Sequence, residues 1–233
     1  MSSSGSYAFN PAAANLTLVA FGRIGIRRTE ITQQHLDDAA NEANLVQVKL
    51  SNLEPNLWKD ELYQVTLTAG TPTYALPQRF IAIQAAYITT QYSGSSTSQD
   101  RIIWPISTFE YAAVPDKTQQ GQPTSYWYNR QITPEISFWP CPDSSATYIL
   151  NLRVCSQIQD AVLPSGVTLD LPYRWLDVFV ADLAYRLSRI YAPDKEVMRK
   201  ADADEAWKNA AFEDQERVPI FIGPGDGMSR YYR

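Results

Sequence analysis

Residues 168–193 read TLDLPYRWLDVFVADLAYRLSRIYAP, and this stretch decides the fold. Within it, large apolar side chains recur every three or four positions, at Leu176, Phe179, Leu183, Leu187 and Ile190. This is the period of a helix with one buried face. Asp170 is a candidate N-cap, Pro172 falls in the first turn, and Pro193 ends the pattern. The stretch therefore predicts a helix of about 30 Å whose apolar face needs packing partners.

Further helical patterns supply these partners. Asn15 is a candidate cap before LTLVAFGRIG, and Gly25 matches a glycine C-cap. Thr32 can cap a second helix that Pro55 stops, and its apolar stripe consists of Leu36, Ala39, Ala43, Val46, Leu50 and Leu53. Asp194 can cap a final helix. Helices are thus expected on both sides of the middle of the chain.

Between the helical segments the apolar period changes to two. Tyr63, Val65 and Leu67 alternate with polar residues, and Gly70-Thr71-Pro72 marks a turn. The other strand candidates, separated by turns that contain Ser, Gly or Pro, are Thr73–Leu76, Phe80–Thr90, Arg101–Pro105, Ser125–Arg130, Glu135–Trp139 and Tyr148–Gln157. Short strands at this spacing predict a sandwich or a small barrel. Thr108 to Ala113 is expected to form one helical turn.

Together these segments predict an α+β fold. The N- and C-terminal helices form a helical bundle, and an antiparallel β-sandwich or barrel module is inserted between them. The arm at the N-terminus is rich in Ser, Gly and Ala and is expected to be flexible. The expected divisions are an arm over 1–14, a helical bundle domain over 15–58 and 171–216, a β module over 59–170, and an extended C-terminal docking tail over 217–233.

The final stretch, RVPIFIGPGDGMSRYYR, breaks the helical pattern. It mixes large apolar groups with prolines and glycines that forbid a helix and discourage a central strand. Such a tail straps onto its own domain, stays disordered or folds onto a partner. If it docks on a partner, the contact residues are expected to be Val218, Ile220, Phe221, Ile222, Met228, Tyr231, Tyr232 and Arg233.

Composition and charge exclude several classes of protein. The hydrophobic fraction of 45% excludes wholesale disorder. Only 19% of residues are charged and 12% are aromatic, a balance typical of proteins that bury surface against partners. The net charge of −5 argues against a protein whose main task is to grip nucleic acid. Because no stretch approaches the ~20 apolar residues of a membrane span, we expect a soluble intracellular product with no membrane partner.

The sequence offers little for catalysis. His35, the only histidine, lies inside a predicted helix, and there is no GxSxG motif. Cys141 and Cys155 are too far apart for a CxxC motif; a reducing compartment explains them, and a disulfide between neighbouring strands stays open. Carboxylates cluster on predicted helix faces, at Asp37, Asp38, Glu42, Asp202, Asp204, Glu205, Glu213, Asp214 and Glu216. We expect no catalytic residue, cofactor or metal, and a carboxylate-dependent hydrolase is the remaining enzyme alternative.

Aromatic residues also gather in the predicted strands. Tyr126, Trp127, Tyr128 and Trp139 can stack on sugars or on nucleic-acid bases, which makes them a candidate contact surface. In a strand, however, Tyr126 and Tyr128 face one side and Trp127 the other, so one side is expected to belong to the core. Cross-strand packing of aromatic rings is the alternative interpretation.

Several short motifs occur in an order typical of one family. They are LTLVAFGRIGIRRTEIT, a helix that reaches Asn56-Leu57-Trp58, then PTYALP, PISTFEY, GQPTSYWYN, ISFWPCPD and TLDLPYRWLDVFVADLAYRLSRIYAP. Each has a physical role as well; Gly121-Gln122-Pro123, for example, turns the chain. Over residues 12–213 the chain resembles the head-to-tail adaptor proteins of short-tailed, podovirus-type bacteriophages.

This resemblance implies a non-enzymatic virion protein that assembles in the host bacterial cytoplasm. Such adaptors form a ring, typically twelvefold, that docks under the portal protein at the head-tail junction. The ring extends the DNA channel, through which double-stranded DNA passes without sequence-specific binding, and it carries the tail nozzle and fibre proteins. By this resemblance the helices form the ring core, the β module faces the tail, and Arg217–Arg233 corresponds to the portal-embracing extension. The alternative is a carbohydrate- or protein-binding tail module.

Overall fold

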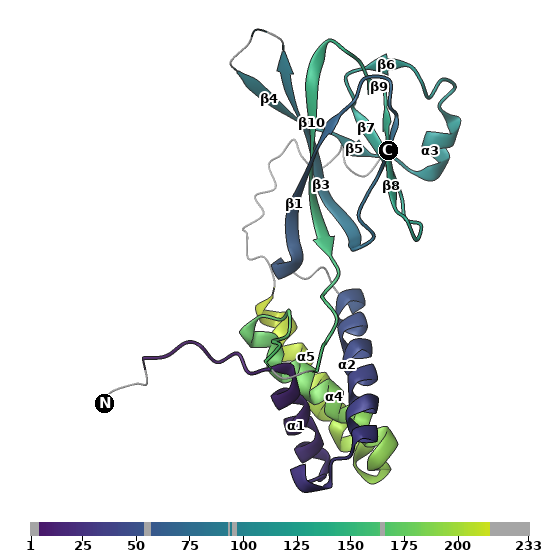
Figure 1. The fold of residues 1–233 in the computed structure, drawn as a ribbon. Coiled ribbons are helices and arrows are strands. Elements are labelled where there is room, and N and C mark those ends of the chain that lie inside the picture. Colours follow the sequence, from purple (N-terminus) through teal and green to yellow (C-terminus); the bar gives the residue numbers. More distant parts are fainter. Residues whose placement is uncertain (1–4, 54–56, 93, 95–96, 164–165, 215–233) are drawn as a thin grey trace, which may run out of the picture.

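The computed structural model describes residues 5–53, 57–92, 94, 97–163 and 166–214 of the chain. Figure 1 shows the long helices gathered at one end of the molecule and the sheets at the other. Within these described ranges, two long helices precede the strands and two follow them. The predicted α+β fold, with sheets inserted between N- and C-terminal helices that pack together, is confirmed.

The helices form one unit around α4 (Leu176–Tyr191). Its partners are α1 (Ala13–Ile24), α2 (Gln33–Leu53) and α5 (Glu196–Glu213), and each of them packs against α4. We call these four helices the helical unit. Because α4 is covered on three sides, its apolar residues extend beyond a single stripe, and Val178, Val180, Ala181 and Ala184 are buried as well.

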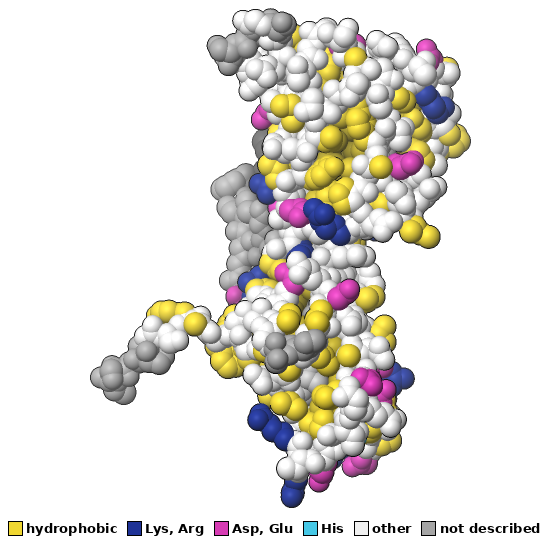
Figure 2. All heavy atoms as spheres, in the orientation of Figure 1, with side chains coloured by type: hydrophobic (Ala, Val, Ile, Leu, Met, Phe, Trp, Pro, Cys, Tyr) yellow, Lys and Arg dark blue, Asp and Glu magenta, His cyan; other side chains and the backbone are white. Residues whose placement is uncertain are grey.

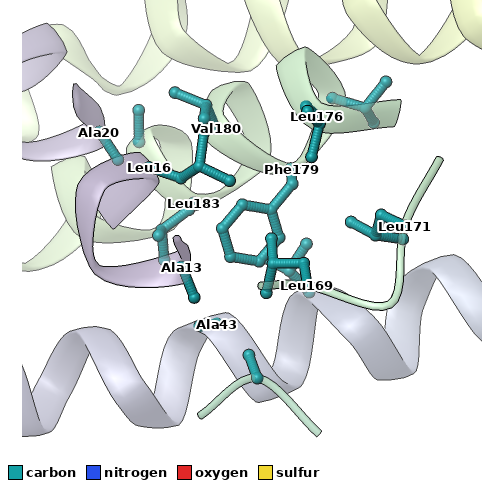
Figure 3. Close-up of a cluster of buried hydrophobic side chains, with 14 of the residues drawn as sticks. Ala13, Leu16, Ala20, Ala43, Leu169, Leu171, Leu176, Phe179, Val180 and Leu183 are labelled. Carbon is teal, nitrogen blue, oxygen red and sulfur yellow. The ribbon is translucent and has the colours of Figure 1, made fainter. Parts of the chain in front are cut away.

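Phe179 lies at the centre of the core of the helical unit. Figure 3 shows its ring between Leu169, Leu183 and the other buried side chains of this cluster. Leu169 belongs to the segment that leads into α4 from the strands of residues 60–156, which we call the β unit, so that segment also takes part in the core. Complete burial of a Phe side chain contributes roughly 1.5–3 kcal/mol. The apolar residues that recur every three or four positions over 176–187 are therefore buried in the core, as the sequence predicts.

Helix α1 begins earlier than predicted. Asn15 is exposed, and the N-cap is Ala12, which has no capping side chain. The backbone N–H of Ala13 instead donates to the carbonyl of Val167 at 2.8 Å, and Ala12 forms an antiparallel bridge with Thr168. A tertiary contact has thus replaced the side-chain cap. The predicted cap at the other end is confirmed, because Gly25 adopts the left-handed conformation with a φ of 95°.

The predicted starts of α4 and α5 are wrong for a shared reason. Asp170 does not cap α4, because the single 3-10 turn Tyr173–Trp175, with Pro172 at its cap position, comes first. Asp194 does not cap α5 either, because it lies inside the 3-10 turn Pro193–Lys195. A proline at the start of such a turn fixes φ and needs no hydrogen-bond acceptor for its nitrogen. Both helices then begin directly after the turn.

Three residues of the predicted apolar stripes are exposed. Leu53 is the last residue of α2 and is 43% exposed, and Ile190 lies next to the end of α4 and is 47% exposed. Leu36, in the first turn of α2, is 36% exposed and lines a groove beside α1. Periodicity predicts the direction in which a side chain points, whereas burial also requires a neighbour at that height of the helix.

The first sheet of the β unit is antiparallel. Its strand order is β1-β10-β3-β4, with bounds Asp60–Leu67, Ala146–Ser156, Phe80–Tyr92 and Ser98–Ile102 respectively. The long strands β3 and β10 pair along their whole length. The period of two that begins at Tyr63 reflects β1, at the edge of this sheet.

A second sheet packs against the first. Its order is β2-β8-β7-β5, with bounds Thr73–Ala75, Glu135–Trp139, Ser125–Asn129 and Trp104–Pro105; β5 runs parallel to β7. Side chains of both sheets share one core, which includes Ile88 and Leu150 from the first and Ile136 and Phe138 from the second. Two sheets over one core form a sandwich. A parallel pair (β6, Gln120–Gly121, and β9, Cys141–Pro142) and the short helix α3 (Thr108–Ala113) complete the β unit.

The chain returns to the helical unit before residue 170. Ile158 and Ala161 are buried in the core of the helical unit, although they lie in the range expected for the β module. The junction is also tied by charge, because Lys59, just before β1, pairs with Asp170 at 2.6 Å. Asp170, the predicted helix cap, therefore links the two units.

A partly buried ion network joins α2 to α4. The carboxylate of Asp182 is 2% exposed; Lys49 lies 2.7 Å from one oxygen and Arg186 3.4 Å from the other. Arg186 also pairs with Glu42 at 3.2 Å. Asp182 would carry an uncompensated buried charge without these partners. The network thus fixes how α2 lies along α4.

Tyr191 and Asp38 form a second polar link between these helices. The hydroxyl of Tyr191 donates to the Asp38 carboxylate. Burial of the phenol, followed by this hydrogen bond, raises the pKa of Tyr191 from 10 to about 12. Because the folded-state pKa lies above the ordinary value, the folded state favours the neutral phenol. Its contribution to stability is complete below pH 10 and is lost as the pH rises towards 12.

We therefore expect Tyr191→Phe to lower the free energy of unfolding by about 1 kcal/mol near neutral pH, since one hydrogen bond is lost. We also expect the difference between the wild type and the variant to shrink between pH 10 and pH 12. Urea unfolding of both proteins across this range measures the difference. Tyr185→Phe is the matched control on α4 and should follow the wild type. A constant difference across the range would contradict this account of Tyr191.

Candidate partner-binding surfaces

The predicted docking residues of the C-terminal tail lie outside the described residues, which end at Asp214; they are Val218, Ile220, Phe221, Ile222, Met228, Tyr231, Tyr232 and Arg233. Asp214 itself is positioned by an ion pair with Arg174, in the 3-10 turn before α4. The start of α4 is also where Lys59 and Asp170 join the two units. The end of α5 therefore lies at the junction between the helical unit and the β unit.

The four aromatic residues of the candidate contact surface do not share one face. Tyr126 is 4% exposed and belongs to the core of the sandwich, and Tyr128 is half-buried against that core. Burial raises the pKa of both phenols above its ordinary value. Trp127 lies on the other face of β7, where its ring stacks on Tyr111 of α3 with 4.9 Å between centroids. The alternation expected for a strand accounts for this division.

Trp139 is separate from the other three. It is half-buried at the end of β8, and its indole N–H donates to the carbonyl of Asp116 at 3.2 Å. The N–H of Trp127 likewise donates to the hydroxyl of Thr108 at 3.1 Å. Both indoles thus hold the segment that contains α3 against the second sheet.

A groove of about 510 Å³ opens between the two sheets of the β unit. Tyr126 and Tyr128 line it together with Ile102 and Trp104, which are 63% and 60% exposed. Figure 2 shows hydrophobic side chains gathered over the β unit on the face in view. Neither Ile102 nor Trp104 was predicted from the sequence as a contact residue. The run Ile102-Ile103-Trp104 could have revealed them, because Ile103 is buried and its neighbours in an extended chain must then face outwards.

His35 has a structural environment. Its Nδ1 lies within hydrogen-bond distance of the backbone nitrogen and the hydroxyl of Thr32, at 3.0 and 2.8 Å. Its ring packs edge-on against Phe21, with 5.8 Å between centroids, and against Tyr191. The imidazole thus joins the N-terminal turn of α2 to α1 and α4.

Several members of the acidic clusters make contacts on the helices, whereas Glu216 lies outside the described residues. Asp38 accepts from Tyr191, Glu42 pairs with Arg186, and Asp202 pairs with Arg199. In the part of the chain that the structure describes, no group of three or more His, Cys, Asp or Glu side chains could hold a metal ion. Among the same residues, no helix is both long enough and apolar enough to cross a bilayer.

Comparison with known proteins identifies the family. The family model described as "SU10 adaptor protein" matches residues 12–219, which include every helix and strand described above. A comparison with curated proteins gave no match. The matched range begins at Ala12, the cap of α1, and extends past α5, so the helical unit and the β unit are both part of the family fold. The chain belongs to the SU10 adaptor protein family of phage head-to-tail adaptors, which have a structural role in the virion.

Proposed function

We propose that this adaptor forms a ring that docks under the portal protein, extends the DNA channel and carries the tail nozzle and fibres. The observation that carries the proposal is the separation of the two units along the molecule (Figure 1), which suits a protein that binds one partner at each end. In this proposal the helical unit builds the ring, with twelvefold symmetry as the expected copy number. The β unit faces the tail.

The C-terminal tail supplies the contact with the portal in this proposal. Residues 217–233, fully extended, can span up to about 55 Å from the end of α5. Helix α4 has 16 residues and is only about 24 Å long. A tail that starts at the junction between the two units can therefore reach past the helical unit to a partner beyond it. Ring symmetry would repeat each modest contact around the junction, so that many weak contacts together give tight binding to the portal.

The groove between the sheets supplies the contact with the tail nozzle. Ile102 and Trp104 place exposed apolar side chains at its edge, and apolar or aromatic anchors in a pocket carry most of the energy of many interfaces. Carbohydrate binding at the same groove is a second candidate, supported by the exposed ring of Trp104. A glycan array separates the two, because a nozzle contact predicts no glycan signal.

Co-sedimentation with purified portal rings tests the proposed docking. We expect the full chain to sediment with the portal rings and to remain in the supernatant in their absence. DNA alone should not replace the portal, because the chain carries a net charge of −5. A chain that stays in the supernatant at micromolar portal would contradict the proposed function.

A further inference from the structure

The helical unit contains a second groove, between α1 and α2. Both helices pack on α4, and the space that they leave between them is about 830 Å³. Its apolar lining includes Leu18 of α1, Leu36 and Ala40 of α2, and Val162 and Leu163 of the segment that returns from the β unit. Leu36 and Val162 are 36% and 46% exposed. The groove is therefore an apolar surface whose side chains are only partly covered by the described chain.

The N-terminal arm complements such a groove, because it carries large apolar side chains that the rest of the described chain leaves exposed. Tyr7 is 100% exposed and Phe9 is 65% exposed. Figure 2 shows hydrophobic side chains on this arm, clear of the body of the molecule. Residues 1–14 contain no charged side chain, so no side-chain charge in the arm opposes entry into an apolar groove. Burial of a Tyr and a Phe removes about 150–250 Å² of surface each.

The arm does not run towards the groove of its own copy. The bridge between Ala12 and Thr168 fixes its base, and the ring of Phe9 lies edge-on to Tyr173, with 6.2 Å between centroids. Figure 1 shows the arm leaving beside α1 and running away from α2. A chain that is directed away from its own groove can still supply the same segment to a second copy.

We propose that the arm of one copy seats Tyr7 and Phe9 in the α1–α2 groove of a neighbouring copy. The inference rests on the proposed ring, whose neighbouring copies it would link. The arm from residue 5 to residue 11 spans up to about 23 Å when extended, and packed helices lie only about 8–10 Å apart. The contact is heterologous, because arm and groove are different surfaces, and a heterologous contact closes into a ring when its rotation permits.

Photo-crosslinking from position 7 tests this contact. Tyr7 is replaced by benzoylphenylalanine in the full chain, copies with light and heavy nitrogen are mixed, and the crosslinked peptides are mapped by mass spectrometry. The sample is irradiated both as the concentrated chain alone and as the chain bound to portal rings. We expect crosslinks between light and heavy copies at residues 33–44 or 160–163 in either sample. Crosslinks within one copy, to the β unit or to residues 217–233, or none at all in both samples, would overturn the proposal.

Two leucines of α2 provide matched variants. Leu36 lines the groove, whereas Leu45 does not, and both are exposed. Leu36→Glu places a carboxylate in the contact and should lower the yield of groove crosslinks by roughly tenfold or more. Leu45→Glu should leave the yield unchanged, and equal yields in the two variants would refute the groove as the binding site. Portal binding is measured separately. Portal binding without groove crosslinks refutes the arm contact alone. Groove crosslinks without portal binding refute the portal-docked ring alone.

Discussion

Deletion of residues 217–233 is expected to weaken binding to the portal by at least about 100-fold and to leave both units folded. The loss corresponds to roughly 2.7 kcal/mol, which is within the range of one or two aromatic anchors. We expect the fold to persist because, among the described residues, the buried members of the core of the helical unit end at Ala211, which precedes the deletion. Circular dichroism reports the fold, and co-sedimentation with portal rings reports the binding.

A matched variant tests whether any loss of exposed apolar surface has the same effect. Ile132, in the β unit, is 90% exposed, so Ile132→Ser removes such a side chain outside residues 217–233. We expect this variant to bind the portal as the wild type does. Phe221→Ser combined with Tyr231→Ser should reproduce most of the deletion. If the shortened chain binds the portal undiminished, the tail has no docking role, and another surface must face the portal.

Asp182→Ala is expected to lower the free energy of unfolding by about 3 kcal/mol. The variant removes the carboxylate that Lys49 and Arg186 share at the interface of α2 and α4. Removal of one member of a buried ion network is costly because the partners lose their compensating charge. Lys49 keeps access to water, with 36% of its side chain exposed, so we expect the effect at the lower end of the usual 3–5 kcal/mol. Urea unfolding measures it.

Asp177→Ala is the control for this prediction. Asp177 also lies on α4 and pairs with a basic residue, Arg23, but 68% of its side chain is exposed. Exposed pairs contribute about 0–1 kcal/mol. The two variants should therefore differ by roughly 2 kcal/mol or more. Equal destabilisation would show that the burial of Asp182 does not determine how much its ion network contributes to the free energy of unfolding.

Apolar periodicity predicted the parts of the fold that depend on local pattern. The three- and four-residue spacing found α4, and the spacing of two found the edge strand β1. Gly25 was predicted correctly because a left-handed C-cap is a local requirement of the backbone. In each case the residues close by in the sequence determine which local structure forms.

Two of the failed helix caps have a tertiary cause. Asn15 and Asp170 are chemically suitable caps, yet the N-terminus of α1 finds its acceptor in Val167, and Asp170 pairs with Lys59. These partners are more than 100 residues away in the sequence. No local signal distinguishes a capping carboxylate from one that makes a distant ion pair, because both residues are polar and lie before an apolar stretch.

The contact residues were predictable only in part. Strand alternation separated Trp127 from Tyr126 and Tyr128, since side chains alternate between faces. The groove beside Ile102 and Trp104 depends on how two sheets open over a shared core, and that is a property of the sandwich rather than of either strand. The α1–α2 groove has the same character, because it exists only once both helices lie on α4.

The mass of the chain with its portal tests the proposed ring most directly. Native mass spectrometry or mass photometry is applied to the full chain alone, to the portal ring alone and to their mixture. We expect a complex whose added mass is a whole ring of adaptor copies of 26.3 kDa each, about one per portal subunit if the symmetry is twelvefold. A mixture that contains only free portal and free chain, or portal with one or two copies attached, would contradict the account.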